Sequence, residues 1–270
     1  MTTSVMWFRR DLRLGDHPAL QAAAAEGPVV PLFVLDPRLA GSGRRWERLL
    51  ASLAALREEM GGALVIRQGD PAEVVAQVAA EAGASQVHVS TETTPYGRRR
   101  DEAVEQRLAD AGIGLVGTGS PYAVTPDRIR NASGAPYRVF TPFLRAWREH
   151  GWRAPAGDAQ VEWMTKLESD PLPEHPEHLD QEAGERAALH RWEDFCAEDL
   201  AGYASARDRP DLDSTSRIST ALKFGEIHPR TLLADLDQHG SGASGEDVER
   251  FVAELAWREF YADVLWHDPG

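Results

Sequence analysis

The first 120 residues alternate short apolar segments with helical patterns, and this alternation limits the possible folds more than any other feature of the chain. The apolar segments have the length of buried strands, and the segments between them are rich in Ala, Leu, Glu and Arg, which favour helix. The expected strands are residues 4–8, 29–36, 64–67, 86–90 and 114–116, and the expected helices are residues 18–26, 44–60, 71–82 and 98–111. Strands that alternate with helices form a parallel sheet with right-handed crossovers. The sequence therefore predicts an α/β domain with a five-stranded parallel sheet, of a nucleotide-binding type.

The last third of the chain shows helical patterns only. The expected helices are residues 186–201, 217–224, 229–238 and 246–266. Between the two parts lies an acidic, Pro-rich stretch, which is typical of a solvated linker wrapped on the surface. We therefore expect an α/β domain over residues 1–131, an interdomain linker over 132–185 and the N-terminal part of an all-α domain over 186–270.

Charge and cysteine content exclude several classes of protein. The net charge of −14 argues against a general nucleic-acid coat protein. Residues 1–150, however, carry 18 Lys and Arg against 17 Asp and Glu, so the excess acid lies in the second half. The single cysteine, Cys196, fits a reducing cytoplasm. No secretion signal is present, and no stretch approaches the ~20 apolar residues that span a bilayer.

We accordingly expect a cytoplasmic monomer without a membrane segment. His175 and His178 flank Pro176 with no third ligand nearby, and a zinc site needs three or four. No metal site is therefore predicted.

Three segments carry chemistry, and the first is the string Met6-Trp7-Phe8-Arg9-Arg10-Asp11-Leu12-Arg13-Leu14-Gly15-Asp16-His17-Pro18-Ala19-Leu20. It is a buried strand that breaks into a charged loop at its carboxyl end, where ligands bind in open α/β sheets. A cluster of Arg and Asp ion pairs that anchors the loop is the alternative, and the physics of the segment alone favours it.

The second segment consists of Tyr203, Arg207 and, a few residues later, the sequence Thr215-Ser216-Arg217-Ile218-Ser219, which lies at a predicted helix start. Hydroxyl groups and free N–H groups at a helix N-terminus receive phosphate, and Arg217 would add charge-assisted hydrogen bonds. Simple helix capping by the Ser and Thr side chains is the alternative.

The third segment lies in the last predicted helix. Glu254, Trp257, Arg258 and Tyr261 fall on one helical face, which combines a carboxylate, an indole, a guanidinium and a phenol. An aromatic stripe of this kind is usually part of a core, so packing is the alternative to a binding role.

Together these segments resemble the DNA photolyase/cryptochrome family, and most closely a class I cyclobutane pyrimidine dimer photolyase. The first resembles the family's W-F-R-R-D-L-R-L-x-D-x-P-A-L opening, the second its T-S-R-L-S motif with Ile218 for Leu, and the third its E-L-x-W-R-E-F-Y. The resemblance implies light-driven repair of damaged DNA by excited, reduced FAD. It assigns the flavin to Tyr203, Thr215, Ser216, Arg217, Ile218, Ser219 and Arg258, the pyrimidine dimer to Glu254 and Trp257, and a DNA contact to Arg207. A dimer flipped out of the duplex needs a pocket that combines an aromatic face with polar groups.

The resemblance also implies a light-harvesting pigment. Residues 92–101 resemble the acid-x-x-P-Y-x-x-x-R-D element of family members that bind 8-hydroxy-5-deazaflavin. The matching positions in this chain are Val34, Arg45, Glu92, Arg100 and Lys223, with Glu92 in place of the usual Asp. We favour the deazaflavin over 5,10-methenyltetrahydrofolate because Lys223 fits it.

The chain is shorter than the photolyases that it resembles, because those proteins continue with a longer helical domain. We therefore expect that this polypeptide cannot repair DNA by itself and holds FAD weakly. A cryptochrome-type blue-light receptor and a non-catalytic nucleotide-binding α/β module are the alternative functions. The repair function further predicts one hollow shared by Glu254, Trp257 and residues 215–219.

Overall fold

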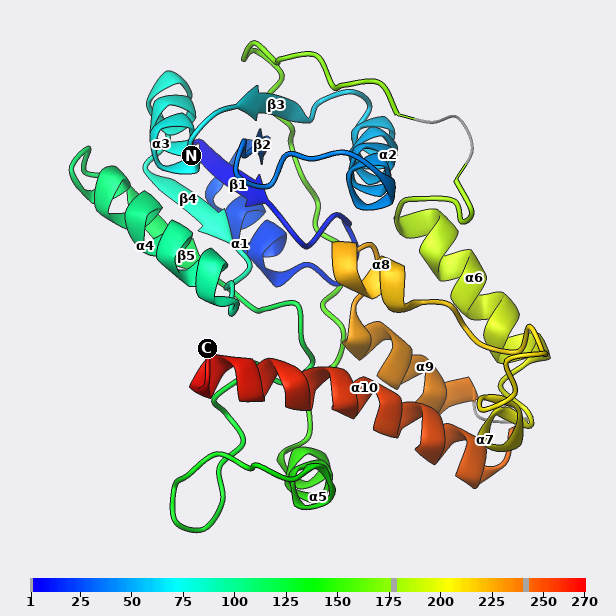
Figure 1. Cartoon of the computed structure of the whole chain (residues 1–270). Helices are drawn as coiled ribbons and strands as arrows, with labels where there is room; N and C mark the ends of the chain where they lie inside the picture. The colour runs from blue at the N-terminus through cyan, green and yellow to red at the C-terminus, as the bar shows by residue number, and fades with distance from the viewer. Residues whose placement is uncertain (1, 176–178, 240–242) are drawn as a thin grey trace.

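The five predicted strands form one sheet in the computed structural model, which describes residues 2–175, 179–239 and 243–270 (Figure 1). All strands are parallel, in the order β3-β2-β1-β4-β5. Their bounds are β1 Ser4–Phe8, β2 Val29–Leu35, β3 Val65–Gln68, β4 Gln86–Val89 and β5 Gly114–Gly117. The predicted fold class is confirmed. The order reverses between β1 and β4, so the crevice expected for a ligand opens at the carboxyl ends of these two strands.

Helices cover both faces of the sheet. Leu20 of α1 (Pro18–Glu26) and Leu53 of α2 (Arg44–Glu59) pack on one face. Val75 of α3 (Pro71–Glu81) and Val104 of α4 (Pro95–Ala109) pack on the other. The helix predicted from residue 98 begins at Pro95 instead, because the Thr94 side chain accepts the Gly97 N–H and caps it.

The segment between the domains contains a helix that was not predicted. This helix is α5 (Phe140–His150), whose Phe143 and Trp147 are buried in the helical core. Further on, the Val29 N–H donates to the Glu162 carbonyl and the Asp170 N–H donates to the Ile66 carbonyl. These hydrogen bonds tie the connector to β2 and to the outer strand β3. The domain boundaries themselves stay predictions.

Among the described residues that follow, five more helices share one core with α5. Their bounds are α6 Glu185–Glu198, α7 Tyr203–Ala206, α8 Ser219–Phe224, α9 Pro229–His239 and α10 Gly245–His267. Helix α8 begins two residues later than predicted, because Arg217 has a positive φ of 48° and cannot continue a right-handed helix. None of the described helices is long and apolar enough to cross a membrane. His178, of the rejected metal pair, lies outside the described residues.

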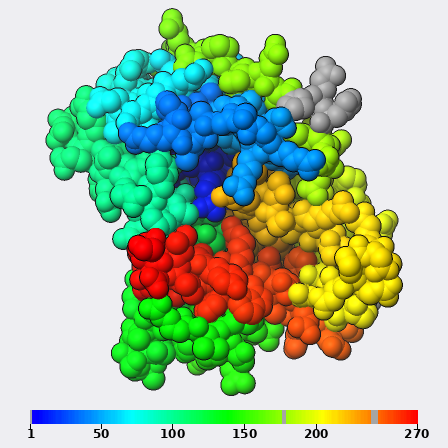
Figure 2. Space-filling model, viewed as in Figure 1, coloured from blue at the N-terminus to red at the C-terminus, as the bar shows by residue number. Residues whose placement is uncertain are grey.

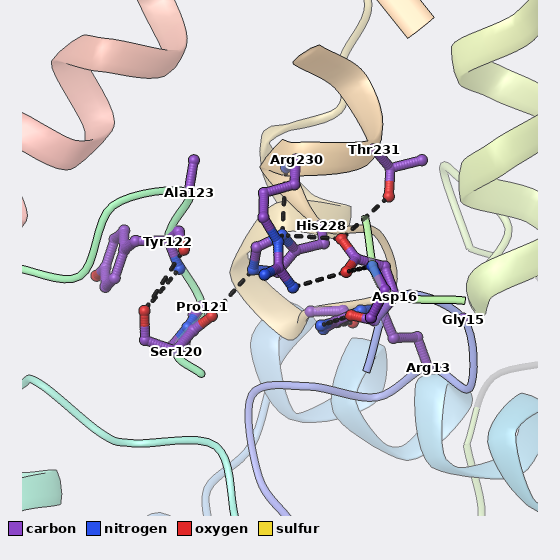
Figure 3. A network of polar contacts seen from close by, with 12 residues as sticks. Arg13, Gly15, Asp16, Ser120, Pro121, Tyr122, Ala123, His228, Arg230 and Thr231 are labelled. Atoms are coloured by element: carbon purple, nitrogen blue, oxygen red, sulfur yellow. Dashed lines mark hydrogen bonds and ion pairs between the residues drawn. The ribbon is translucent and has the colours of Figure 1, made fainter. Parts of the chain in front are cut away.

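A buried polar network joins the two parts of the chain (Figure 3). Arg230 Nη2 donates to Asp16 Oδ1 at 2.6 Å, and His228 Nε2 lies 2.9 Å from the Ser120 carbonyl oxygen. Nearby, Gly225 has a φ of 73° and its Cα lies so close to the Arg10 carbonyl that an added Cβ would be 2.0 Å from that oxygen. The loop after β1 is therefore held tightly against α8 and α9.

Candidate cofactor and lesion site

The charged loop after β1 is largely an internal ion-pair cluster, as the alternative interpretation of this segment predicts. The Arg9 N–H donates to Asp11 Oδ1 at 2.7 Å, and Arg9 Nη1 donates to Asp101 at 3.0 Å. Burial opposes ionisation of Asp11, but the nearby His17, with 3.4 Å between Nε2 and Oδ2, and the charge of Arg9 outweigh it and lower the pKa of Asp11. Arg10 differs from Arg9, since it points to Glu92 at the end of β4, with 3.4 Å between Nη1 and Oε1.

A cavity of about 550 Å³ opens between α2, α8 and the end of the connector. It brings together residues predicted for two ligands, because Arg45 and Lys223 line it with Arg217 and Ser219. The other lining residues are Arg44, Glu47, Arg48, Leu179, Asp180, Gln181, Thr220 and Phe224. Five of the twelve are cationic, so an anionic ligand suits this cavity. In Figure 2 the surface is hollowed between α2, α4, α8 and α10, with the N-terminal chain at the bottom of the hollow.

The charges of Glu92 and Lys223 interact with one another and with that of Arg10. Burial disfavours the Glu92 carboxylate, but Arg10 and the N–H groups of Thr93 and Thr94 outweigh it and lower its pKa. Partial desolvation lowers the pKa of Lys223, and the charges of Arg10 and Arg45 act in the same direction. Arg45, Glu92 and Lys223 are thus the three predicted antenna residues that the structure groups together.

The two other predicted antenna residues lie apart from this group. Val34 is 6% exposed and packs in the sheet core. Arg100 lies over the Trp7 ring, 4.8 Å from its centroid, and donates to Asp101. It lines a separate cavity of about 120 Å³ together with Tyr96. Val34 and Arg100 therefore stay predicted pigment contacts only for a ligand that extends along the edge of the sheet.

The hydroxyl-rich segment before α8 does not cap that helix. Helix α8 has Ile218 at its N-cap without a side-chain hydrogen bond, so the capping alternative fails here. Thr215 and Ser219 are exposed, Ser216 is half-buried and accepts the Ile218 N–H at 3.5 Å, and Ile218 itself is buried. The buried hydroxyl of the preceding residue, Ser214, has no hydrogen-bond partner among the described residues. Free hydroxyls beside the exposed Arg217 fit a phosphate-bearing group such as FAD.

Tyr203 and Arg207 lie beside this segment on α7 and at its end. The Tyr203 ring is buried against Phe195 and Phe251. Arg207 Nη1 donates to Glu254 Oε1, and this hydrogen bond raises the pKa of Arg207. Arg207 therefore fixes the carboxylate of Glu254 and occupies one of its two oxygens.

Helix α10 directs its predicted site residues to different neighbours. Trp257 stacks on Phe140 of α5, with ring centroids 3.6 Å apart and an interplanar angle of 9°. On its other flank Trp257 stacks with Tyr261, with ring centroids 5.5 Å apart, and Tyr261 itself is 63% exposed. Arg258 donates instead to the carbonyls of Pro121 at 2.9 Å and Leu222 at 3.2 Å, so it anchors α10 to α8.

The cavity of about 550 Å³ does not join Glu254 and Trp257 to residues 215–219, and the shared hollow stays a prediction. The 550 Å³ cavity is lined by Arg217 and Ser219 but by neither Glu254 nor Trp257. Trp257 turns toward α5, whereas the cavity opens on the α2 side of α8. The described residues thus provide two surfaces, a basic cavity and an aromatic face on α10.

Three residues of these surfaces were absent from the predicted site. Arg44 and Arg48 line the cavity with Arg45. Their spacing of four residues, which places them on one face of the predicted helix, could have indicated that they share a site. Phe140, which stacks on Trp257, gave no signal, because its helix was not predicted.

Known proteins resemble this chain over its whole length. The family model for DNA photolyase matches residues 4–162. A deoxyribodipyrimidine photo-lyase of Thermus thermophilus is 38% identical over 269 residues, which are 98% of this chain and 61% of the relative. An uncharacterized protein from Synechococcus sp. (strain PCC 6716) is 35% identical and is covered to 98% of its length.

Among solved structures, a bacterial class III photolyase from Agrobacterium tumefaciens matches with a TM-score of 0.91 and 33% identity, over 100% of this chain and 60% of the other. The chain thus spans about three fifths of the length of the photolyases that it matches. The family model covers more than half of the chain. This chain belongs to the DNA photolyase family.

Proposed function

We propose that this chain serves in the light-driven repair of cyclobutane pyrimidine dimers in DNA. The observation that carries the proposal is the face of α10, where the half-buried Trp257 indole and the Arg207-bound Glu254 carboxylate lie one helical turn apart. An aromatic surface beside a fixed hydrogen-bond acceptor suits a base that has left its stack. Membership of the photolyase family, whose members bind FAD, supports the same function.

Each residue of this face has a distinct task in the proposal. Trp257 packs against the flipped dimer on the part of its surface that Phe140 and Tyr261 leave open. Glu254 accepts a hydrogen bond from a base N–H at Oε2, because Arg207 already occupies Oε1. Thr215, Arg217 and Ser219 hold the phosphates of FAD. When bound and excited by light, reduced FAD supplies the electron that splits the two cyclobutane bonds and receives it back, so no net oxidation or reduction results.

The part of the basic cavity at Arg45 and Lys223 is proposed to hold the light-harvesting pigment, next to Arg217 and Ser219, which are proposed for FAD. Arg45 and Lys223 line the cavity and would bind the anionic oxygens of 8-hydroxy-5-deazaflavin. Glu92, which acts electrostatically on Lys223, would accept an N–H of the pigment. The folate 5,10-methenyltetrahydrofolate, which is also anionic, is the alternative occupant. Pigment extracted from the purified protein and identified by its absorption spectrum separates the two.

The chain covers about 61% of its photo-lyase relatives, so the activity of the whole protein is part of the proposal. We propose that the 270-residue polypeptide by itself holds FAD weakly and does not complete repair. A stoichiometric flavin spectrum in the purified polypeptide, or repair of a dimer under light with added reduced FAD, would contradict this part.

Lesion recognition is tested by DNA binding. Labelled duplexes with and without a single thymine dimer are titrated with the purified chain, with Trp257→Ala and with Leu265→Ala, an exposed position on the same helix. We expect tighter binding of the damaged duplex by the chain and by Leu265→Ala. Loss of base stacking, worth about 1–3 kcal/mol, should lower this preference about tenfold in Trp257→Ala. Equal binding of both duplexes by the unmodified chain would sink the proposed function.

A further inference from the structure

The three fully buried tryptophans of the described chain differ in what surrounds their indole N–H groups. Trp147 Nε1 donates to Glu259 Oε2 at 2.6 Å, and Trp192 Nε1 donates to Asp235 Oδ2 at 3.0 Å. Trp7 Nε1, in contrast, has no hydrogen-bond partner among the described residues. An indole that loses an electron becomes acidic, so a neighbouring carboxylate eases its oxidation by accepting the N–H proton. Because no such acceptor lies beside Trp7 in the described part of the chain, its oxidation would create a buried positive charge.

Two guanidinium groups lie over the ring of Trp7. The Cζ atoms of Arg9 and Arg100 are 4.6 and 4.8 Å from its centroid. Asp101 holds both groups in place, because its Oδ1 accepts from Arg9 Nη1 at 3.0 Å and from Arg100 Nη2 at 2.8 Å. The side chains of Arg9 and Arg100 are only 6% and 8% exposed, so water and salt screen their charges little.

These two cations oppose oxidation of the ring. A guanidinium group is attracted by the π electrons of the neutral indole but is repelled by the positive charge of an indole radical cation. Asp101 offsets part of this repulsion, but its carboxylate is shared by both arginines, whereas each guanidinium lies over the ring itself. Burial, the two cations and the unpartnered N–H therefore all raise the oxidation potential of Trp7.

Trp7 lies close to the residues proposed for the pigment. It belongs to β1, and Arg10, three residues further on, is 3.4 Å from Glu92. The charge of Arg9 acts on Glu92 as well. An electron-rich aromatic side chain near an excited flavin-type pigment can donate an electron to it, and this reaction competes with the transfer of light energy. The position of Trp7 thus makes its oxidation potential important for light harvesting.

We propose that Arg9 and Arg100 protect the excited pigment by making Trp7 a poor electron donor. Without the two guanidinium groups, the excited pigment would take one electron from Trp7, which gives a pigment radical anion and a tryptophan radical cation. The electron would then return to Trp7, and the light energy would be lost as heat. With the guanidinium groups in place, the electron stays on Trp7 and the excitation remains available for transfer to FAD.

Arg9 and Arg100 act in this proposal through Trp7 and not by contact with the pigment. The benefit for the pigment rests on the proposed function. The raised oxidation potential of Trp7 does not, since it depends only on the groups around the ring.

The first test measures electron donation by Trp7 without any pigment. A ruthenium tris-bipyridyl label is attached at Ala103→Cys, an exposed position one turn after Arg100 on α4, in a Cys196→Ala background. A light flash with hexaammineruthenium(III) as electron acceptor leaves the label as ruthenium(III), which takes one electron from a nearby tryptophan. Transient absorption then gives the yield of tryptophan radical. We expect Arg100→Gln to raise this yield several-fold, and Trp7→Phe to abolish the increase.

Two matched variants control for the charge. Arg100→Lys keeps a cation at the position and should raise the radical yield less than Arg100→Gln. Arg99→Ala removes an exposed cation from the adjacent position and should leave the yield unchanged. Arg9→Gln, which removes the other guanidinium group, provides a second variant of the same kind, and thermal unfolding shows which variants are folded.

The second test measures the pigment itself. The fluorescence lifetime of 8-hydroxy-5-deazaflavin bound to the chain is recorded for the variants without the label. We expect a shorter lifetime in Arg100→Gln and the original lifetime in Arg100→Gln/Trp7→Phe. A merely structural role of Arg100 does not predict this recovery, because a second substitution in the core does not repair a disturbed fold.

The outcomes separate this proposal from the proposed function. Equal radical yields in the labelled parent and in its Arg100→Gln variant would overturn the tuning of Trp7, whatever the pigment does. A yield that depends on both Arg100 and Trp7, in a chain that does not bind the deazaflavin, would support the tuning and contradict the proposed pigment site. A shortened lifetime that persists in Arg100→Gln/Trp7→Phe would overturn the protection of the pigment and indicate direct contact between Arg100 and the pigment.

Discussion

Asp16, in the loop after β1, lies against His228 at the start of α9, with 3.2 Å between Asp16 Oδ2 and His228 Nδ1, and both side chains are buried. The N–H and Nε groups of Arg230 both donate to this same Nδ1 atom, which therefore carries a lone pair, and the proton lies on Nε2. Burial, together with the charges of Arg13 and Arg230, lowers the pKa of His228 to about 3. The network that joins the α/β domain to the helical part thus depends on a neutral imidazole.

The first prediction is a loss of stability in mild acid. His228 has an ordinary pKa of 6.5 when unfolded and about 3 when folded, so its contribution is complete above pH 6.5 and is lost as the pH falls toward 3. One proton bound only by the unfolded state changes the unfolding free energy by about 1.4 kcal/mol per pH unit, or about 2 kcal/mol between pH 6.5 and 5. Urea unfolding at about pH 7.5 and about pH 5 should show this loss in the unmodified chain and not in His228→Gln. His190→Gln, at an exposed histidine, should retain it, and equal pH dependence in all three would refute the prediction.

The second prediction concerns the close approach at Gly225. A Cβ at this position would lie 2.0 Å from the Arg10 carbonyl oxygen, and the φ of 73° adds strain. Gly225→Ala should therefore lower the unfolding free energy by about 4 kcal/mol or leave the chain unfolded. Gly83→Ala, at a φ of 62° with open space around it, should cost only about 1 kcal/mol. Thermal unfolding of the pair measures the difference, and similar melting temperatures would show that the loop after β1 can move away from α8.

The third prediction concerns the buried carboxylate of Glu259. It accepts hydrogen bonds from Trp147 Nε1 at 2.6 Å and from the backbone N–H groups of Ala123 and Val124. Burial raises its pKa, although these bonds act in the opposite direction. Glu259→Ala leaves three buried donors without a partner and should cost about 3 kcal/mol or more. Glu249→Ala, at an exposed position on the same helix, should change stability by less than about 0.5 kcal/mol in the same denaturant titration.

The fourth prediction separates the basic cavity from the α10 face. Lys223→Ala should weaken binding of an 8-hydroxy-5-deazaflavin about tenfold, because a charge-assisted hydrogen bond contributes about 1.5–3 kcal/mol. The preference for dimer-containing DNA should stay unchanged, since Lys223 lines the cavity and does not contact Trp257. Equilibrium dialysis gives the pigment affinity, and Lys166→Ala serves as the control. Loss of pigment in Arg100→Ala but not in Lys223→Ala would place the pigment in the smaller cavity.

The sequence alone determined the sheet and most of the helices. Strand β2 is an apolar run, the other strands have apolar residues at their centres, and helices α1, α3 and α4 each begin with a proline behind a capping side chain, as at Asp70 and Thr94. These signals are local, because hydrogen bonds within a helix and burial of a whole strand involve neighbours in the chain. The segments around Arg9, Arg217 and Trp257 likewise predicted the family without any contact being known.

Only the tertiary structure decided which of these segments meet. Helix α5 escaped prediction, and it supplies Phe140 to the indole of Trp257. Arg258, on the same predicted face as Glu254, turns to the carbonyls of Leu222 and Pro121. Arg45 and Arg217 come to line one cavity although they were predicted for different ligands. Side-chain direction depends on packing between distant elements, and no periodicity along the chain encodes which element will lie across from a given helical face.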